Sequence, residues 1–322
     1  MLRPMAGAAG VARTGTRDDP KRAMSNVTIG IASLGRPCLS RTLASLCAIQ
    51  IPADYRVEIV VADDDRDGAA AARVAAGQPW ALPVRVLPVA AGNISLARNA
   101  CLDAADGEWV AFVDDDEWVE PDWLVRMFAA QVEFGADVVV GPVFPQYPAD
   151  TPAWLVDANP LFVDWGPRGK RLDTGRSGNV LIRRSLVERL GLRFDPKLGK
   201  SGGEDTEFFH RLHLAGAVLV ATDDARIYEE VPQARLAPAY IRRRALRSGQ
   251  SYAQFRLKGG QGRDLAGLLF HLDAAAKCAV AFAAGTALRR LRPGRAFYLE
   301  QRGWMNLGKL RQLTGRDLPS MY

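Results

Sequence analysis

The chain has 322 residues, of which 48% are hydrophobic and 24% charged, as in an ordinary globular protein of one large domain or a domain with an appendage. The formal net charge is +6, and the four cysteines form no C-x-x-C pair, which argues against a zinc site or a disulfide framework and fits a reducing cytoplasm. Residues 1–24 contain no apolar signal-peptide core, so we expect a disordered leader. No run of about 18 uncharged apolar residues is present, so a membrane-spanning helix is not expected.

Strands and helices alternate along residues 25–257. Short β-branched runs between polar residues predict strands at 27–32, 57–62, 84–88, 110–113, 138–143, 179–182 and 218–221. Apolar residues at helical spacing predict helices at 39–49, 93–105, 121–134, 184–190, 204–215 and 237–257. Residues 144–178 lack periodicity and predict a long loop on the substrate side. The pattern indicates an α/β fold with a mostly parallel central sheet flanked by helices, and a helical C-terminal extension at 258–322.

Two carboxylate clusters follow predicted strands, at 63–65 and at 114–116. Ligands of open α/β sheets bind beyond the carboxyl ends of the strands. Strand alternation would put Asp114 and Asp116 on one side and Asp115 on the other. Adjacent carboxylates repel one another unless a cation lies between them, and Mg²⁺ or Mn²⁺ prefers oxygen ligands. We therefore predict Asp114 and Asp116 as metal ligands, with a solvated acidic turn as the alternative.

Five segments occur in a fixed order: VTIGIASLGRP at 27–37, VEIVVADDD at 57–65, GNISLARNACLDAADGEWVAFVDDDE at 92–117, GNVLIRRSL at 178–186 and GGEDTEFFHRL at 202–212. Together they resemble the family-2 glycosyltransferases with the GT-A fold, and most of all the succinoglycan-type bacterial glucosyltransferases. The resemblance extends from residue 27 to about residue 254. It implies an inverting, metal-dependent transfer of a sugar from a nucleotide-diphospho-sugar, with a UDP-sugar as first choice. The expected acceptor is a glycan or a lipid-linked glycan of polysaccharide biosynthesis.

The same resemblance assigns roles to residues on the donor side. Asp63 matches the acidic residue that contacts the base, although a carboxylate capping the next turn would look the same in sequence. Arg98 would lie near the ribose or the phosphates, unless it is merely a surface arginine. Asp114 and Asp115 complete the expected donor-binding set. The divalent cation would neutralise the diphosphate as it leaves.

On the acceptor side, the resemblance implies a general base from a Glu-Asp pair. Here the pair is Glu204-Asp205; we predict Asp205 as the base and Glu204 as the next candidate. Two acids in the first turn of a helix would also stabilise that helix. Many GT-A enzymes add a late histidine as a metal ligand, and the segment 228–232 (YEEVP) offers none, so the ion would be held by Asp116 with diphosphate and water, or by a glutamate. The i, i+3 pair His210 and His213 is expected to serve packing.

Two other classes of function are compatible with parts of the chain. A sugar nucleotidyltransferase shares the parallel sheet and paired carboxylates, but SLGRP at 33–37 is a poor version of its glycine-rich signature. A non-catalytic nucleotide-sugar or nucleic-acid binder needs neither metal carboxylates nor a base. The basic tract 235–256 contains few aromatic residues, so no nucleic acid is expected as a partner.

The basic tract also suggests an anionic membrane surface as a partner. Its cluster on the predicted helix comprises Arg242, Arg243, Arg244 and Arg247. The following segment has an apolar stripe of Leu265, Leu268, Leu269, Leu272 and Ala276. The resemblance implies a lipid-linked acceptor and therefore a cytoplasmic enzyme at the inner face of the cytoplasmic membrane, and these two features predict that it lies on that surface without spanning it. The alternative is a donor-phosphate clamp and an amphipathic helix packed on the catalytic domain.

Overall fold

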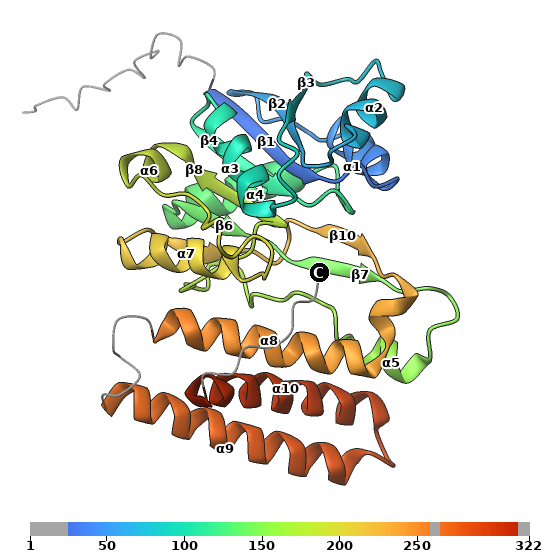
Figure 1. The fold of residues 1–322 in the computed structure, drawn as a ribbon, viewed down its shortest axis with the longest axis vertical. Coiled ribbons are helices and arrows are strands. Elements are labelled where there is room, and N and C mark those ends of the chain that lie inside the picture. The colour runs from blue at the N-terminus through green and yellow to red at the C-terminus, as the bar shows by residue number, and fades with distance from the viewer. Residues whose placement is uncertain (1–24, 258–264, 315–322) are drawn as a thin grey trace, which may run out of the picture.

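The computed structural model describes residues 25–257 and 265–314 (Figure 1). Its central sheet has seven strands in the order β3-β2-β1-β4-β8-β6-β9. Their bounds are β1 (Ser25–Ser33), β2 (Tyr55–Asp63), β3 (Val84–Pro88), β4 (Trp109–Val113), β6 (Val138–Val140), β8 (Asn179–Arg183) and β9 (Leu219–Ala221). Neighbours pair in parallel except at β8, which is antiparallel to both β4 and β6. The predicted mostly parallel sheet is confirmed.

Helices cover both faces of this sheet. The bounds are α1 (Leu39–Leu46), α2 (Ala69–Ala76), α3 (Ile94–Ala104), α4 (Trp123–Phe134), α5 (Ala153–Ala158), α6 (Arg184–Arg189), α7 (Glu204–Leu214), α8 (Pro238–Arg256), α9 (Leu265–Leu288) and α10 (Pro293–Arg311), with 3₁₀ turns at Gln233–Leu236 and Gln312–Thr314. One buried cluster joins Ile29 of β1 to Leu43 of α1 and Met127 of α4, while a second joins Phe112 of β4 to Phe208 of α7. Because strand side chains alternate between faces, a single sheet supplies both clusters.

A second, smaller sheet lies beside the first and was not predicted. It consists of β5 (Glu117–Val119), β10 (Ile227–Glu230) and β7 (Val143–Gln146), with β10 in the middle. The predicted strand 138–143 is wrong as a single element, because Pro142 separates β6 from β7. The predicted loop 144–178 contains α5 and all of β7 except its first residue. Helix α2, which was not predicted, follows the second strand. The antiparallel pairing places Glu229 of β10 opposite Glu117 of β5, which matters for the site.

The C-terminal helices form a layer below the central sheet, with α10 between α8 and α9 (Figure 1). Glycines allow helices α8 and α10 to pack closely against each other. A β-carbon on Gly308 would lie 2.0 Å from the carbonyl oxygen of Leu246, and one on Gly249 would lie 1.8 Å from that of Met305. On the other side α10 packs on α5, where the rings of Trp154 and Phe297 meet edge to face. The predicted leader, 1–24, lies outside the described residues.

We expect Gly308→Ala to destabilise the protein. Alanine is favoured over glycine in a helix by about 1 kcal/mol, but the new methyl group would overlap a backbone atom, and overpacking of this kind costs about 1–3 kcal/mol or more. The net effect should be a lower urea midpoint with an unchanged slope. Ser248→Ala, at an exposed position of α8, is the matched control and should be neutral or slightly stabilising. An unchanged midpoint for Gly308→Ala would show that the two helices are not held this closely in solution.

Candidate active site

The polar residues predicted from the sequence gather at one edge of the central sheet. β2, β1 and β4 are adjacent parallel strands, so Asp63, Ser33 and the acidic run after Val113 meet at their carboxyl ends. The antiparallel strand β8 starts at the same edge, directly after Gly178. A β-carbon on Gly178 would lie 2.7 Å from a Glu117 carboxylate oxygen, so only glycine lets the backbone approach the acidic cluster here.

Arg98 is the residue that connects the two halves of the site. It lies in α3, is 3% exposed, and its guanidinium donates to Asp114 at 3.1 Å and to Glu204 at 2.7 Å. The surface-arginine alternative is therefore wrong. Asp114 and Glu204 lie 90 positions apart in sequence, yet one buried cation pairs with both. Charged groups this buried are retained only when paired, so Arg98 fixes the distance between the strand-end carboxylates and the Glu-Asp pair.

Asp115 contacts residues other than Arg98, and these contacts hold the acidic turn in place. It is 1% exposed and accepts a hydrogen bond from the Ser33 hydroxyl at 2.7 Å, and it forms an ion pair with Arg36. Arg36 also pairs with Asp116 at 2.8 Å. The expected alternation, with Asp114 and Asp116 on one side and Asp115 on the other, is wrong in this respect. β4 ends at Val113, so the acidic run is a turn to which strand alternation does not apply.

Four carboxylates crowd next to this turn. Burial and the neighbouring charge of Asp114 raise the pKa of Asp116 to about 6. Burial and the same neighbour raise the pKa of Glu117 well above its usual range, and Glu229 adds to both effects. Arg235 offsets part of this charge, lying 3.8 Å from Asp116 and pairing with Glu229. Neither glutamate was singled out from the sequence, because only the small sheet brings them here.

This crowding fits a divalent cation. Oxygen ligands from carboxylates are what Mg²⁺ and Mn²⁺ prefer, and a cation would relieve the repulsion that raises the pKa of Asp116. Within residues 25–257 and 265–314, no group of three or more His, Cys, Asp or Glu side chains is placed so that it could hold a metal ion. Mg²⁺ is commonly bound by one or two carboxylates together with phosphate oxygens of a ligand.

Glu204 and Asp205 open α7, and their environments differ. Burial and the neighbouring Asp205 raise the pKa of Glu204 to about 7, although Arg98 opposes this. Burial would also raise the pKa of Asp205, but the cations Arg98 and Arg176 overcome it and hold that pKa below its usual value. Asp205 is thus the anion of the pair. It also accepts a hydrogen bond at 3.3 Å from the backbone amide of Ser177, which lies just before β8.

The two acids at the end of β2, Asp63 and Asp64, accept hydrogen bonds from backbone amides. Asp63 is 2% exposed and accepts from the amides of Asp65 at 3.2 Å and Ala71 at 2.8 Å, which is the turn-capping arrangement. The next residue, Asp64, accepts hydrogen bonds from the backbone amides of Ala91, Gly92 and Asn93 at 2.6–2.9 Å and so fixes the loop before α3. Asp64 thereby positions the helix that carries Arg98.

His210 is buried and its Nδ1 lies 3.0 Å from the Asp173 carbonyl oxygen, which agrees with a packing role.

The arginines of α8 do not form one patch. Arg242 and Arg243 are exposed, whereas Arg247 lies against Gly202 in the loop before α7. Burial and the cations Arg176 and Arg235 lower the pKa of Arg244, so Arg244 faces the site. The expectation of a single membrane-facing cluster on α8 is wrong for Arg244 and Arg247.

The comparisons with known proteins agree with this geometry. The family model described as "Glycosyl transferase family 2" matches residues 29–191. The chain is 38% identical over 241 residues to the succinoglycan biosynthesis protein ExoM of Rhizobium meliloti, covering 74% of this chain and 77% of that protein. It is 29% identical over 136 residues to the putative glycosyltransferase EpsH of Bacillus subtilis, covering 38% of this chain and 37% of that one.

Solved structures show the same fold at low identity. The mannosyltransferase PcManGT of Pyrobaculum calidifontis, in complex with GDP-mannose and Mn²⁺, matches with a TM-score of 0.55 and 20% identity over 93% of this chain and 92% of that one. Residues 1–349 of TarS from S. aureus match with a TM-score of 0.51 and 19% identity over 91% and 92%. The fold is thus that of the GT-A glycosyltransferases. The chain belongs to glycosyl transferase family 2 and is a glycosyltransferase.

The electrostatics of Asp205 lead to a prediction about pH. Arg176 favours the ionised form of Asp205, so Arg176→Gln should raise the pKa of Asp205. If Asp205 acts as an ionised base, the acid limb of the pH–rate profile should move to higher pH, so that activity is lost at higher pH than in the wild type. The control is Arg171→Gln, an exposed residue of the same loop. A profile that only falls in height would mean that Arg176 acts elsewhere.

Proposed function

We propose that this protein is an inverting, metal-dependent enzyme that moves a sugar from a nucleotide-diphospho-sugar to a glycan or lipid-linked acceptor of bacterial polysaccharide biosynthesis. The observation that carries this proposal is Arg98, which places the strand-end carboxylate Asp114 beside the Glu204-Asp205 pair. Donor-side acids and an acceptor-side base at a fixed distance are what a single displacement requires. Family membership sets aside the nucleotidyltransferase and the non-catalytic binder.

In this proposal Asp205 accepts the proton of the acceptor hydroxyl while the hydroxyl oxygen forms a bond to C1 of the donor sugar. The bond between C1 and the diphosphate oxygen breaks on the opposite face, and the nucleoside diphosphate carries away the electron pair. The charges of Arg98 and Arg176 keep the Asp205 carboxylate ionised, and the bonds of Arg98 to Glu204 and Asp114 connect the Glu-Asp pair to the donor side. Asp114 and Asp116, with Glu229 as a further candidate, would hold the cation, which when bound stabilises charge on the leaving diphosphate.

The donor nucleotide is proposed to be UDP, with Asp63 nearest the base. TarS structures have been solved with UDP and with UDP-GlcNAc, and PcManGT with GDP-mannose, so both nucleotides occur on this fold. The relative ExoM is named for succinoglycan biosynthesis, which supports a polysaccharide as the product. We place the enzyme in the cytoplasm, peripheral to the inner face of the cytoplasmic membrane, where lipid-linked acceptors are reached.

The test is turnover with a panel of UDP-, GDP- and TDP-sugars, each with and without Mg²⁺ or Mn²⁺. Release of a nucleoside diphosphate that depends on acceptor, and a product whose anomeric configuration is opposite to that of the donor, are the expected results. Retention of configuration would contradict the single displacement. Formation of pyrophosphate from a nucleoside triphosphate and a sugar phosphate would point to the nucleotidyltransferase instead.

A further inference from the structure

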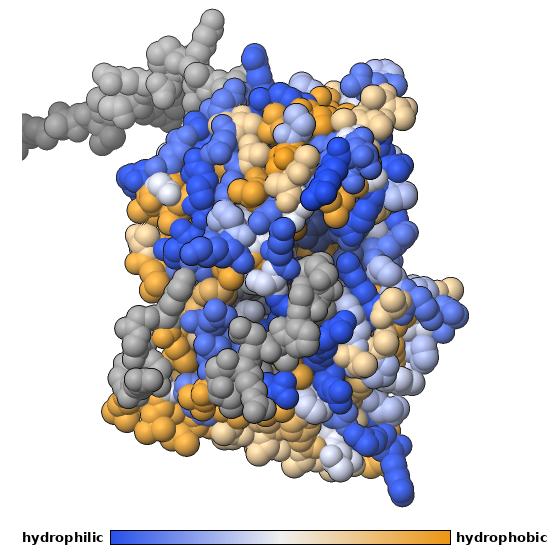
Figure 2. Space-filling view, in the orientation of Figure 1, coloured by the Kyte–Doolittle hydropathy of each residue, from blue (hydrophilic) through white to orange (hydrophobic). Residues whose placement is uncertain are grey.

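Helix α9 has its large apolar side chains on the outside. The positions that it buries against the protein are small residues and a histidine: Gly267, His271, Ala274, Ala281 and Gly285. The large apolar residues are exposed by half or more: Leu265 (71%), Leu268 (54%), Leu269 (56%), Leu272 (56%) and Val280 (68%). A helix of a soluble domain normally shows the reverse pattern. Figure 2 shows hydrophobic residues gathered along the lower edge of the molecule, where α9 lies.

The inner face of α9 explains why its leucines stay outside. Gly285 would place a β-carbon 3.1 Å from the Ala296 carbonyl oxygen, and Phe282 packs against Gly303 and, edge to face, against Trp304 of α10. This close contact occupies the small-residue face. Among the described residues, α9 is the one helix long and apolar enough to cross a bilayer, which the sequence alone did not lead us to expect. Because one face is packed on α10, a position along a surface fits better than a crossing.

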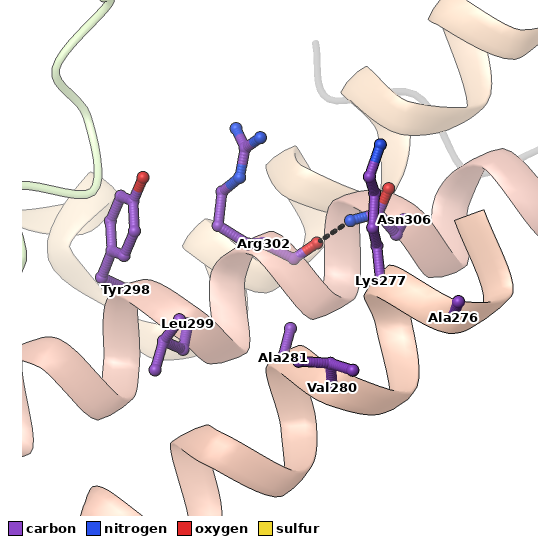
Figure 3. A pocket seen from close by; sticks show the side chains of 8 residues that line it. All are labelled: Ala276, Lys277, Val280, Ala281, Tyr298, Leu299, Arg302 and Asn306. Atoms are coloured by element: carbon purple, nitrogen blue, oxygen red, sulfur yellow. Dashed lines mark hydrogen bonds between the residues drawn. The ribbon is translucent and has the colours of Figure 1, made fainter. Parts of the chain in front are cut away.

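A groove between α9 and α10 adjoins this apolar face. It has a volume of about 450 Å³, and its floor includes Val280, Ala281 and Leu299. Lys277 and Arg302 line it, and Figure 3 shows both charged groups pointing away from the helices on the same side. Lys277 pairs with Asp273 at 2.6 Å, while Arg302 makes no ion pair with any described residue. The groove thus combines an apolar floor with an available guanidinium.

Positive charge continues around the apolar face. The turn between α9 and α10 carries three exposed arginines, Arg289, Arg290 and Arg292, and a fourth, Arg295, lies exposed in the first turn of α10. Glu300 offsets one of them, at 2.6 Å from Arg289. Lys309 of α10 adds to this charge, and burial together with the cations Lys277 and Arg302 lowers its pKa. Leucines beside cations are the pattern of helices that lie in the interface of an anionic bilayer.

We propose that α9 lies flat on an anionic bilayer with its leucines among the acyl chains, and that the groove binds a lipid phosphate beside Arg302. This deepens the proposed function, because it rests on the membrane location proposed above and names the surface responsible. A second copy of the chain fits the face less well. A symmetric dimer presents the same patch twice, so the cations around the face would meet cations.

Vesicle flotation of the full chain tests the proposal. Wild type should float with vesicles of phosphatidylcholine mixed with phosphatidylglycerol, and much less with phosphatidylcholine alone. Leu268→Asp combined with Leu272→Asp should lower binding by about tenfold or more, since charges replace the inserted side chains. Arg302→Gln should lower binding to the anionic vesicles roughly fivefold and leave neutral vesicles unaffected. The controls are Val132→Asp, an exposed apolar site on α4, and Arg189→Gln, an exposed site on α6, and both should float as wild type does.

Two other measurements on the same preparations separate the possible failures. Donor turnover with a soluble acceptor should be unchanged in every variant, since none touches the site. If wild type floats but transfers no sugar, the inference stands and the proposed function fails. Wild type that floats with neither vesicle, or a leucine variant that floats like wild type, would overturn the inference. A dimer in light scattering that the leucine variant dissociates would also overturn it, by assigning the face to a second copy.

Discussion

Replacing Asp205 with asparagine should lower sugar transfer by about 10²–10⁴-fold, the usual loss for a positioned general base. Asparagine has the same shape and keeps an oxygen for the Ser177 amide, so the opening of α7 should be retained. Its amide cannot take the proton of the acceptor hydroxyl at neutral pH. Donor affinity should change little, because Arg98 keeps its contact with Asp114. Initial rates with saturating donor and calorimetric titration with nucleoside diphosphate measure the two quantities separately.

Asp173→Asn is a suitable control for this variant. Asp173 lies in the loop that precedes β8 and accepts a hydrogen bond from the Tyr252 hydroxyl at 2.8 Å, away from the base. Its turnover should stay close to that of wild type. If Asp205→Asn transfers sugar at the wild-type rate, Asp205 is not the base. Glu204, whose pKa is raised to about 7 by burial and by Asp205, would then be the residue to replace next.

The regular elements of the catalytic domain could be predicted from the sequence because their periodicity is strong. β1 and β2 are nine-residue strands with nearly continuous burial, and α1 has apolar residues at Leu39, Leu43 and Leu46. The small sheet could not be predicted in this way, since β5 has three residues and β10 four. It is formed by pairing between segments far apart in sequence, as with Glu117 and Glu229.

The sequence predicted which residues belong to the site, but not which of them contact one another. The ordered segments correctly brought Asp114 and the Glu204-Asp205 pair to one edge of the sheet. Arg98 could not be given its partners, because a buried ion pair across 106 positions leaves no local pattern. Asp115 was predicted as part of the donor-binding set, and the turn after β4 directs its carboxylate to the Ser33 hydroxyl. Side-chain direction beyond the end of a strand depends on the turn, which periodicity does not describe.

Chelation of divalent cations should abolish sugar transfer, and Asp116→Asn should weaken it strongly. A cation at a leaving diphosphate supplies several kcal/mol, and each 1.36 kcal/mol is a factor of ten, so a loss of about 10²-fold or more is expected. Burial and Asp114 already raise the pKa of Asp116, so a cation beside these carboxylates should be favourable. Removing one of the two charges should lower affinity for both the metal and the donor. Rates in excess EDTA, then with Mg²⁺ or Mn²⁺ restored, give the first measurement.

Thermal stability provides a second measurement that does not depend on turnover. A ligand that binds only the folded state raises the melting temperature by mass action, so Mn²⁺ with nucleoside diphosphate should stabilise wild type and should stabilise Asp116→Asn much less. Asp122→Asn is the matched control, because Asp122 lies just before α4 and pairs with Arg126. Full activity in excess EDTA would contradict the metal. The residues that hold the leaving diphosphate would then be sought among the cations that surround the acidic cluster, Arg176, Arg235 and Arg244.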